Sequence, residues 1–75
     1  MLQEVRKKRG YTQSELANIT GIPLQTIQKY ECGYANINNA NLRTLLKLCV
    51  ALYCDLEDIL TDKELIEILG VMYRE

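Results

Sequence analysis

Histidine is missing from this 75-residue chain, and serine occurs once, at Ser14 near a predicted helix start. The three cysteines, Cys32, Cys49 and Cys54, form no CxxC pair of the kind that holds zinc. No activated nucleophile and no paired general acid and base can be assembled from these residues. We therefore expect no catalysis, no bound metal and no other cofactor, and the odd cysteine count argues against a disulfide framework.

Long apolar runs are missing as well. None approaches the roughly 20 residues of a membrane-spanning helix, and the basic residues 6–9 are not followed by an apolar stretch of signal-peptide length. The sequence therefore predicts a cytoplasmic protein without membrane contact. Repeats, low-complexity segments and linkers are also absent, which indicates a single compact unit. Because so short a chain buries only a modest core, a partner chain is a reasonable expectation.

Net charge is small, at −1, whereas proteins that bind nucleic acid are commonly basic. The charges are divided unevenly along the chain. Residues 1–33 hold five basic and three acidic residues, net +2, and residues 34–75 hold four basic and seven acidic residues, net −3. A basic half can present one face to phosphate although the whole chain is slightly acidic. Ordinary scatter over a short chain explains the division equally well.

Apolar residues recur at helical spacing and show no extended alternation, which predicts an all-α fold. The first three helices are expected at residues 2–9, 13–19 and 24–31. Thr12 and Glu15 form a predicted capping box at the start of the second helix. The side chains expected to be buried in the second and third helices are Leu16, Ala17, Ile19, Ile27 and Tyr30.

The second half of the chain predicts two further helices and a C-terminal helical segment. Asn38 is the expected cap of a helix at 39–53, whose inward residues would be Leu42, Leu45, Leu46, Cys49 and Leu52. Asp55 caps a short helix that buries Leu56, Ile59 and Leu60, and Thr61 begins a second capping box. The last segment carries an apolar stripe of Leu65, Ile66, Leu69, Met72 and Tyr73, which packs either on its own core or in a second copy.

The second and third helices have the features of a helix-turn-helix. Thr20, Gly21 and Ile22 form the turn, and the small Ala17 fits beneath the helix crossing. Inward packing of the third helix leaves four residues free to point outward, namely Leu24, Gln25, Gln28 and Lys29.

Residues 2–60 resemble the lambda-repressor-like, Cro-type helix-turn-helix family, also called the XRE family. The matching stretches are LQEVRKKRGYTQSELANITGI, TIQKYECG, LRTLLKLCVAL and DLEDIL, in the family's order and spacing. The resemblance implies a five-helix DNA-binding domain at residues 1–60, followed by an amphipathic helical extension at residues 61–75. The loop GYANINNAN is longer than the family's usual Gly-Lys-x-x-Pro loop.

The resemblance also implies roles for individual residues. Leu24, Gln25, Gln28 and Lys29 are the expected base readers, with Gln28 near the groove edge, and chemistry agrees: glutamine pairs with adenine, lysine with guanine, and leucine with the thymine methyl. Glu31 matches a glutamate that is usually structural. The expected phosphate contacts are Gln13, Thr26, Asn36 and Arg9. The family often has lysine at the position of Tyr34, so one phosphate anchor is missing.

Two functions follow from these patterns. The first is a sequence-specific transcriptional regulator of repressor type that binds double-stranded DNA as a homodimer. The alternative is a protein-interaction module, such as an antitoxin or a docking domain. It is supported by the acidic residues between 55 and 67 and by the apolar C-terminal stripe, and an antitoxin could perform both functions.

Overall fold

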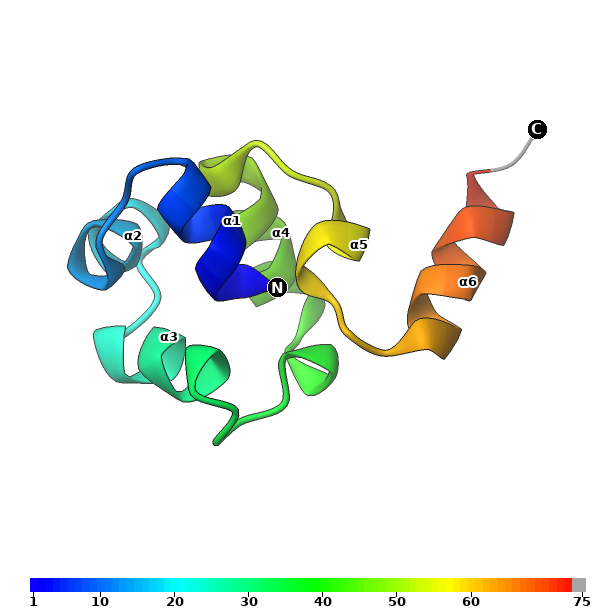
Figure 1. Ribbon diagram of the computed structural model, residues 1–75, viewed down its shortest axis with the longest axis horizontal. Coiled ribbons are helices and arrows are strands. Elements are labelled where there is room, and N and C mark those ends of the chain that lie inside the picture. The colour runs from blue at the N-terminus through cyan, green and yellow to red at the C-terminus, as the bar shows by residue number, and fades with distance from the viewer. Residues whose placement is uncertain (74–75) are drawn as a thin grey trace.

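The computed structural model describes residues 1–73, and within this range the chain is helical without any strand, as its sequence predicted. The elements in chain order are α1 (Leu2–Lys8), α2 (Gln13–Thr20), α3 (Leu24–Glu31), the 3-10 helix η1 (Ile37–Asn39), α4 (Leu42–Leu52), α5 (Leu56–Ile59) and α6 (Lys63–Met72) (Figure 1). Residues 74–75 of the predicted C-terminal extension lie outside the described range. None of the helices in residues 1–73 has the length and apolar character that a bilayer crossing requires.

One apolar core joins the first five helices. Its fully buried side chains come from α2, α3, α4 and α5, and they are Leu16, Ile27, Leu48, Leu52 and Ile59. Each such side chain contributes about 1.5–3 kcal/mol through removal from water. The core therefore fixes α2 and α3 relative to one another through their inward faces.

The predicted capping box before α2 and the predicted glycine turn after it are confirmed. The backbone N–H of Glu15 donates to Thr12 Oγ1 over 3.1 Å, and the Thr12 N–H donates to Glu15 Oε1 over 2.9 Å. At the other end, Gly21 has a φ of 75°, in the left-handed region that glycine enters without strain. This residue turns the chain sharply between α2 and α3.

The prediction that Ile19 is buried is wrong. Its side chain is 54% exposed, and Thr20 takes the inward position. The helix runs one residue further than expected, so Thr20 lies one turn after Leu16 on the same face. The Thr20 hydroxyl donates to the Leu16 carbonyl over 2.7 Å and accepts from the Ile22 N–H over 3.2 Å, which lets a polar side chain be buried there.

The predicted inward face of α4 is also partly wrong. Leu45 and Leu52 are buried as expected, but Leu48 completes the core face, whereas Leu42 and Leu46 are 61% and 47% exposed. The helix carries leucines on two faces, and periodicity alone does not say which of them meets the core.

Asn41, not Asn38, caps α4: its side-chain oxygen accepts from the Thr44 N–H over 2.8 Å. Asn38 instead joins η1 to the start of α6. Its side-chain oxygen accepts from the N–H groups of Thr61 and Asp62 over 2.8 and 2.9 Å, and its amide donates to the Thr61 hydroxyl. The Thr61 hydroxyl is therefore not a helix cap, and Asp62 caps α6 by accepting from the N–H groups one turn on.

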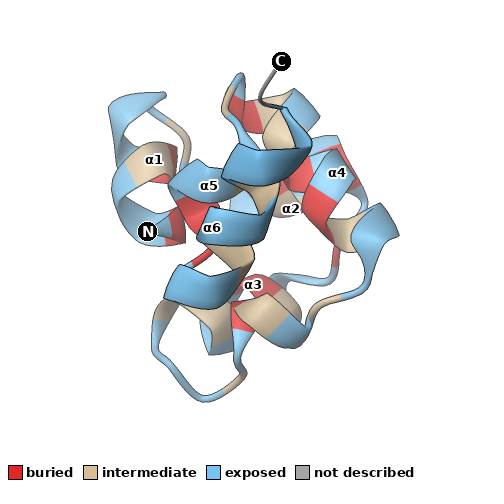
Figure 2. Cartoon of the chain, turned by 90° about the vertical axis from the view of Figure 1, so that its right-hand side faces the viewer, coloured by how far each residue is buried: buried red, intermediate tan, exposed pale blue. Residues whose placement is uncertain are grey.

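α6 lies at the edge of the five-helix body (Figure 1), and most of its surface is open in the view of Figure 2. Leu65, Ile66 and Leu69 are half-buried against the core. Met72 and Tyr73, which were predicted on the same stripe, are 67% and 76% exposed. The stripe thus packs on its own core through its first half only.

Substitution of Gly21 tests the left-handed backbone conformation of the turn between α2 and α3. A Cβ at Gly21 or at Gly70 would meet no atom within 4 Å, but only Gly21 has a positive φ. We expect Gly21→Ala to lower the free energy of unfolding by about 1–2 kcal/mol through left-handed strain. Gly70→Ala, inside α6, should leave stability unchanged or raise it by up to about 1 kcal/mol. Urea unfolding followed by circular dichroism measures both, and equal stability of the two variants would refute the turn geometry.

Candidate nucleic-acid interface

The outward side of α3 is uncovered. Leu24, Gln25, Gln28 and Lys29 are exposed, whereas Ile27 on the opposite side is fully buried and Tyr30 is half-buried. No side-chain group of Gln25, Gln28 or Lys29 has a hydrogen-bond partner within residues 1–73. These four residues, called the reading face below, are therefore free to bond to an external surface.

The first turn of α3 leaves the backbone N–H groups of Leu24 and Gln25 without a partner in residues 1–73, whereas that of Thr26 donates to the Pro23 carbonyl over 3.0 Å. The residue before the helix is Pro23, and no side chain caps the N–H groups of this turn. Uncapped N–H groups and the positive end of the helix dipole attract anions such as phosphate. The start of α3 thus combines a polar face with an end suited to negative charge.

A buried ion pair holds α3 against α1. Arg6 Nε lies 2.7 Å from Glu31 Oε2, and Arg6 Nη2 lies 2.8 Å from Glu31 Oε1, so the guanidinium bonds to both carboxylate oxygens. A third bond runs from Arg6 Nη1 to the Tyr11 carbonyl over 2.7 Å. The side chains are only 9% and 2% exposed. Arg6 belongs to the basic run of residues 6–9, and its burial leaves this guanidinium unavailable to phosphate.

The pair keeps Glu31 ionised. Burial by itself raises the pKa of this carboxyl, but the hydrogen bonds from Arg6 and Gln13, together with the Arg6 charge, outweigh it and lower the pKa. An ionised Glu31 neutralises Arg6 and accepts three hydrogen bonds from two helices. Glu31 therefore holds the C-terminal end of α3 against α1 and against the start of α2.

Gln13, a predicted phosphate contact, is hydrogen-bonded to Glu31. Its Nε2 donates to Glu31 Oε1 over 3.0 Å, and it is the first residue of α2. A glutamine amide has two N–H donors and one oxygen, so one donor and the oxygen remain for other partners. The bond to Glu31 orients the half-buried amide at the start of α2.

The other predicted phosphate contacts differ in their surroundings. Arg9 Nε donates to the Leu52 carbonyl over 2.7 Å and Arg9 Nη2 to the Tyr53 carbonyl over 2.9 Å, so this guanidinium caps the C-terminus of α4. Thr26 is half-buried on α3. Asn36 is exposed before η1, where its side-chain oxygen accepts from the N–H of Asn38 over 3.0 Å. The structure does not bring Arg9 to the reading face.

Two of the three cysteines, Cys49 and Cys54, offer little reactivity. Burial, followed by the neighbouring Cys49, raises the pKa of Cys54 to about 12, and burial also raises the pKa of Cys49. The thiolate is the reactive form of cysteine, and these shifts make it scarce at neutral pH. Across residues 1–73, no three cysteine or carboxylate side chains are grouped as ligands for a metal ion.

Comparison with known proteins defines the class. A family model of the Cro/C1-type helix-turn-helix DNA-binding domain matches residues 1–64. The chain belongs to this family, which confirms the resemblance inferred from residues 2–60. It is 50% identical over 32 residues to a protein of Pyrococcus abyssi (strain GE5 / Orsay) that bears the name "Putative HTH-type transcriptional regulatory protein". That match covers 43% of this chain and 10% of the relative. No solved structure matches the chain.

The ion pair should control both stability and its pH dependence. Glu31→Gln leaves Arg6 buried without its counter-charge, and we expect the free energy of unfolding at pH 7 to fall by about 3–5 kcal/mol. In the parent, the lowered pKa of Glu31 provides stability that is complete above its unfolded pKa of about 4.3. This stability is lost as the pH falls through the lower folded pKa.

Denaturant unfolding at pH 7, 5 and 3 tests this expectation. The Gln variant should show a smaller loss on acidification than the parent, because the contribution of Glu31 is already gone. Glu57→Gln is the matched control, since Glu57 is exposed and has no hydrogen-bonding or ionic partner within residues 1–73. A Glu31→Gln variant as stable as this control at pH 7 would contradict the role of the pair.

Proposed function

We propose that the chain is a sequence-specific, repressor-type transcriptional regulator that binds double-stranded DNA in the cytoplasm as a homodimer. The observation that carries the proposal is the exposed reading face of α3 with Ile27 fully buried behind it. A helix anchored in this way can enter the major groove without losing its own packing. The family and the named relative support the general class.

Base recognition is assigned to the reading face. Gln25 can donate to and accept from adenine through N6 and N7, and Lys29, one turn later, can reach guanine O6 and N7. Leu24 suits a thymine methyl group, and Gln28 lies nearer the groove edge. This combination favours a half-site that contains both A·T and G·C pairs, which are distinguished by polar contacts as well as by shape.

Phosphate contacts are assigned to Gln13, Thr26 and Asn36, together with the uncapped first turn of α3. Arg9 is not included, because it would have to leave the carbonyls of Leu52 and Tyr53 to reach DNA. A single reading face contacts few base pairs. Two copies on half-sites about 34 Å apart, one turn of the duplex, are the expected arrangement.

Two glutamine substitutions separate base contacts from phosphate contacts. Gln25→Ala should cost about 1–3 kcal/mol on the preferred site and relax the preference at one base position. Gln13→Ala should weaken binding to all sequences by a similar factor, because phosphate carries no sequence information. Selection from a random duplex pool, followed by fluorescence anisotropy on preferred and scrambled sites, measures both effects. Equal losses on every sequence for both variants would refute the assignment of Gln25.

The salt dependence of binding tests the proposed function as a whole. Each neutralised phosphate releases counterions, so the logarithm of the binding constant should fall linearly with the logarithm of salt concentration. We expect a slope of roughly −3 to −6 for a dimer with few cationic contacts. Anisotropy titrations between low and physiological salt measure it. No retention of any duplex at low salt would refute the proposal.

A second candidate is a protein-interaction module such as an antitoxin. It is favoured by the apolar side chains that α6 leaves exposed, Ile68, Val71 and Met72. A partner protein co-purifying with the chain, together with absent DNA binding, would favour this function over the first.

A further inference from the structure

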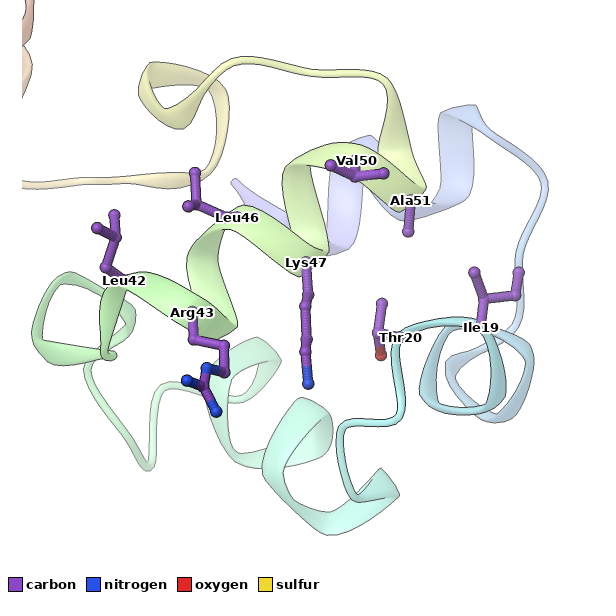
Figure 3. A pocket seen from close by; sticks show the side chains of 8 residues that line it. All are labelled: Ile19, Thr20, Leu42, Arg43, Leu46, Lys47, Val50 and Ala51. Carbon is purple, nitrogen blue, oxygen red and sulfur yellow. The ribbon is translucent and has the colours of Figure 1, made fainter.

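A shallow groove lies between the end of α2 and the outward face of α4. Its apolar wall is formed by Leu42, Leu46 and Val50 of α4, with Ile19 of α2 at one end (Figure 3). These side chains are 61%, 47%, 77% and 54% exposed, respectively. Such a set of neighbouring apolar side chains on a small domain marks an interaction surface.

One edge of this groove is cationic. Arg43 and Lys47 leave α4 on the same side, one turn apart (Figure 3). Both are exposed, and neither takes part in an ion pair within residues 1–73. The groove therefore suits an amphipathic helix with an apolar strip and an acidic edge.

The outward face of α6 has these properties. Its inner residues are half-buried on the core, and the opposite side carries Glu64, Glu67, Ile68 and Val71, all exposed. Neither carboxylate has an ion-pair partner in the described part of the chain. This face points away from the body to which α6 is attached, so it cannot reach the groove of its own chain without detaching.

We propose that α6 of one copy lies in the α2–α4 groove of a second copy, and that the exchange is reciprocal. This proposal specifies the interface of the homodimer in the proposed function and rests on it for its biological role. Reciprocal exchange fills both grooves and produces a closed twofold assembly. No residue of α3 lines the groove, so the reading face stays free.

The two helices match when they run parallel. Lys47 directly follows Leu46 on α4, whereas Glu67 directly precedes Ile68 on α6, so the two charges flank their apolar strips on opposite sides. When the two helices face each other and run parallel, these opposite flanks meet, so Glu67 lies against Lys47 and the apolar strips face one another. In an antiparallel arrangement Glu67 would lie on the other flank of α4, which carries no cation. Charge complementarity therefore selects both the occupant and its direction.

Mixing of two single variants tests the exchange. In Lys47→Glu alone, both interfaces of the dimer oppose Glu67 to a glutamate, and in Glu67→Lys alone, both oppose two lysines. We expect each variant alone to dimerise at least about tenfold more weakly than the parent. In an equimolar mixture, one interface has the parental pair and the other has the reversed pair. Sedimentation equilibrium without DNA should show the mixture recovering the parental dimer fraction.

An apolar variant controls for the charge effects. Val50→Glu should weaken the dimer at least about tenfold because it places a carboxylate in the apolar strip. Tyr34→Glu is the matched control, since Tyr34 is 82% exposed but lies outside the groove, and it should dimerise like the parent. Circular dichroism confirms that each variant is folded. A monomeric parent, a mixture that stays monomeric, or an intact Val50→Glu dimer would overturn the proposal.

These outcomes are independent of DNA binding. If the mixed variants recover the dimer but no duplex is bound, the proposed interface stands and the proposed function fails. If duplexes are bound by a dimer that is unaffected by Val50→Glu, the function stands and this interface fails.

Discussion

The buried pair of Arg6 and Glu31 is the interaction on which the reading face depends. It connects α1 to the end of α3, and through Gln13 it reaches the start of α2. Two charges withdrawn from water are costly, and their mutual attraction compensates only when geometry and hydrogen bonding are nearly complete. Here the guanidinium bonds to both carboxylate oxygens and to a carbonyl, so a displacement of α3 would break several bonds together. A helix that is proposed to read bases must be held in one position, and this pair supplies that constraint for α3.

The apolar core and the turn act together with the pair. Ile27 packs α3 inward at its middle, Gly21 sets the sharp entry from α2, and Glu31 holds the far end. Three different interactions thus locate eight residues of α3. The inward positions of α3 are occupied by side chains that pack on the core. The side chains that remain on its outer side are those of Leu24, Gln25, Gln28 and Lys29. The polar surface is a consequence of the packing beneath it, and its chemistry can vary without changing the fold.

Much of this arrangement could be predicted from the sequence because its signals are local. The capping box at Thr12, the turn at Gly21 and the bounds of α3 depend on neighbouring residues and are confirmed. The errors concern contacts across the fold. α4 offered two leucine faces, and only its packing partners decide that Leu48 is buried and Leu46 exposed. The carbonyls capped by Arg9 lie 43 and 44 residues away, and no local pattern indicates them.

The same tertiary contacts lower the number of cations available to DNA, in a chain of a DNA-binding family whose net charge is −1. Counting charges overstates the cations that can meet phosphate, because Arg6 is neutralised by Glu31 and Arg9 is bonded to α4. The reading face itself has a single cation, Lys29. Since non-specific affinity grows with the number of phosphates neutralised, one copy gains little from charge and must rely on polar contacts. Two copies on one duplex would double both contributions, which is the physical basis of the homodimer proposed above.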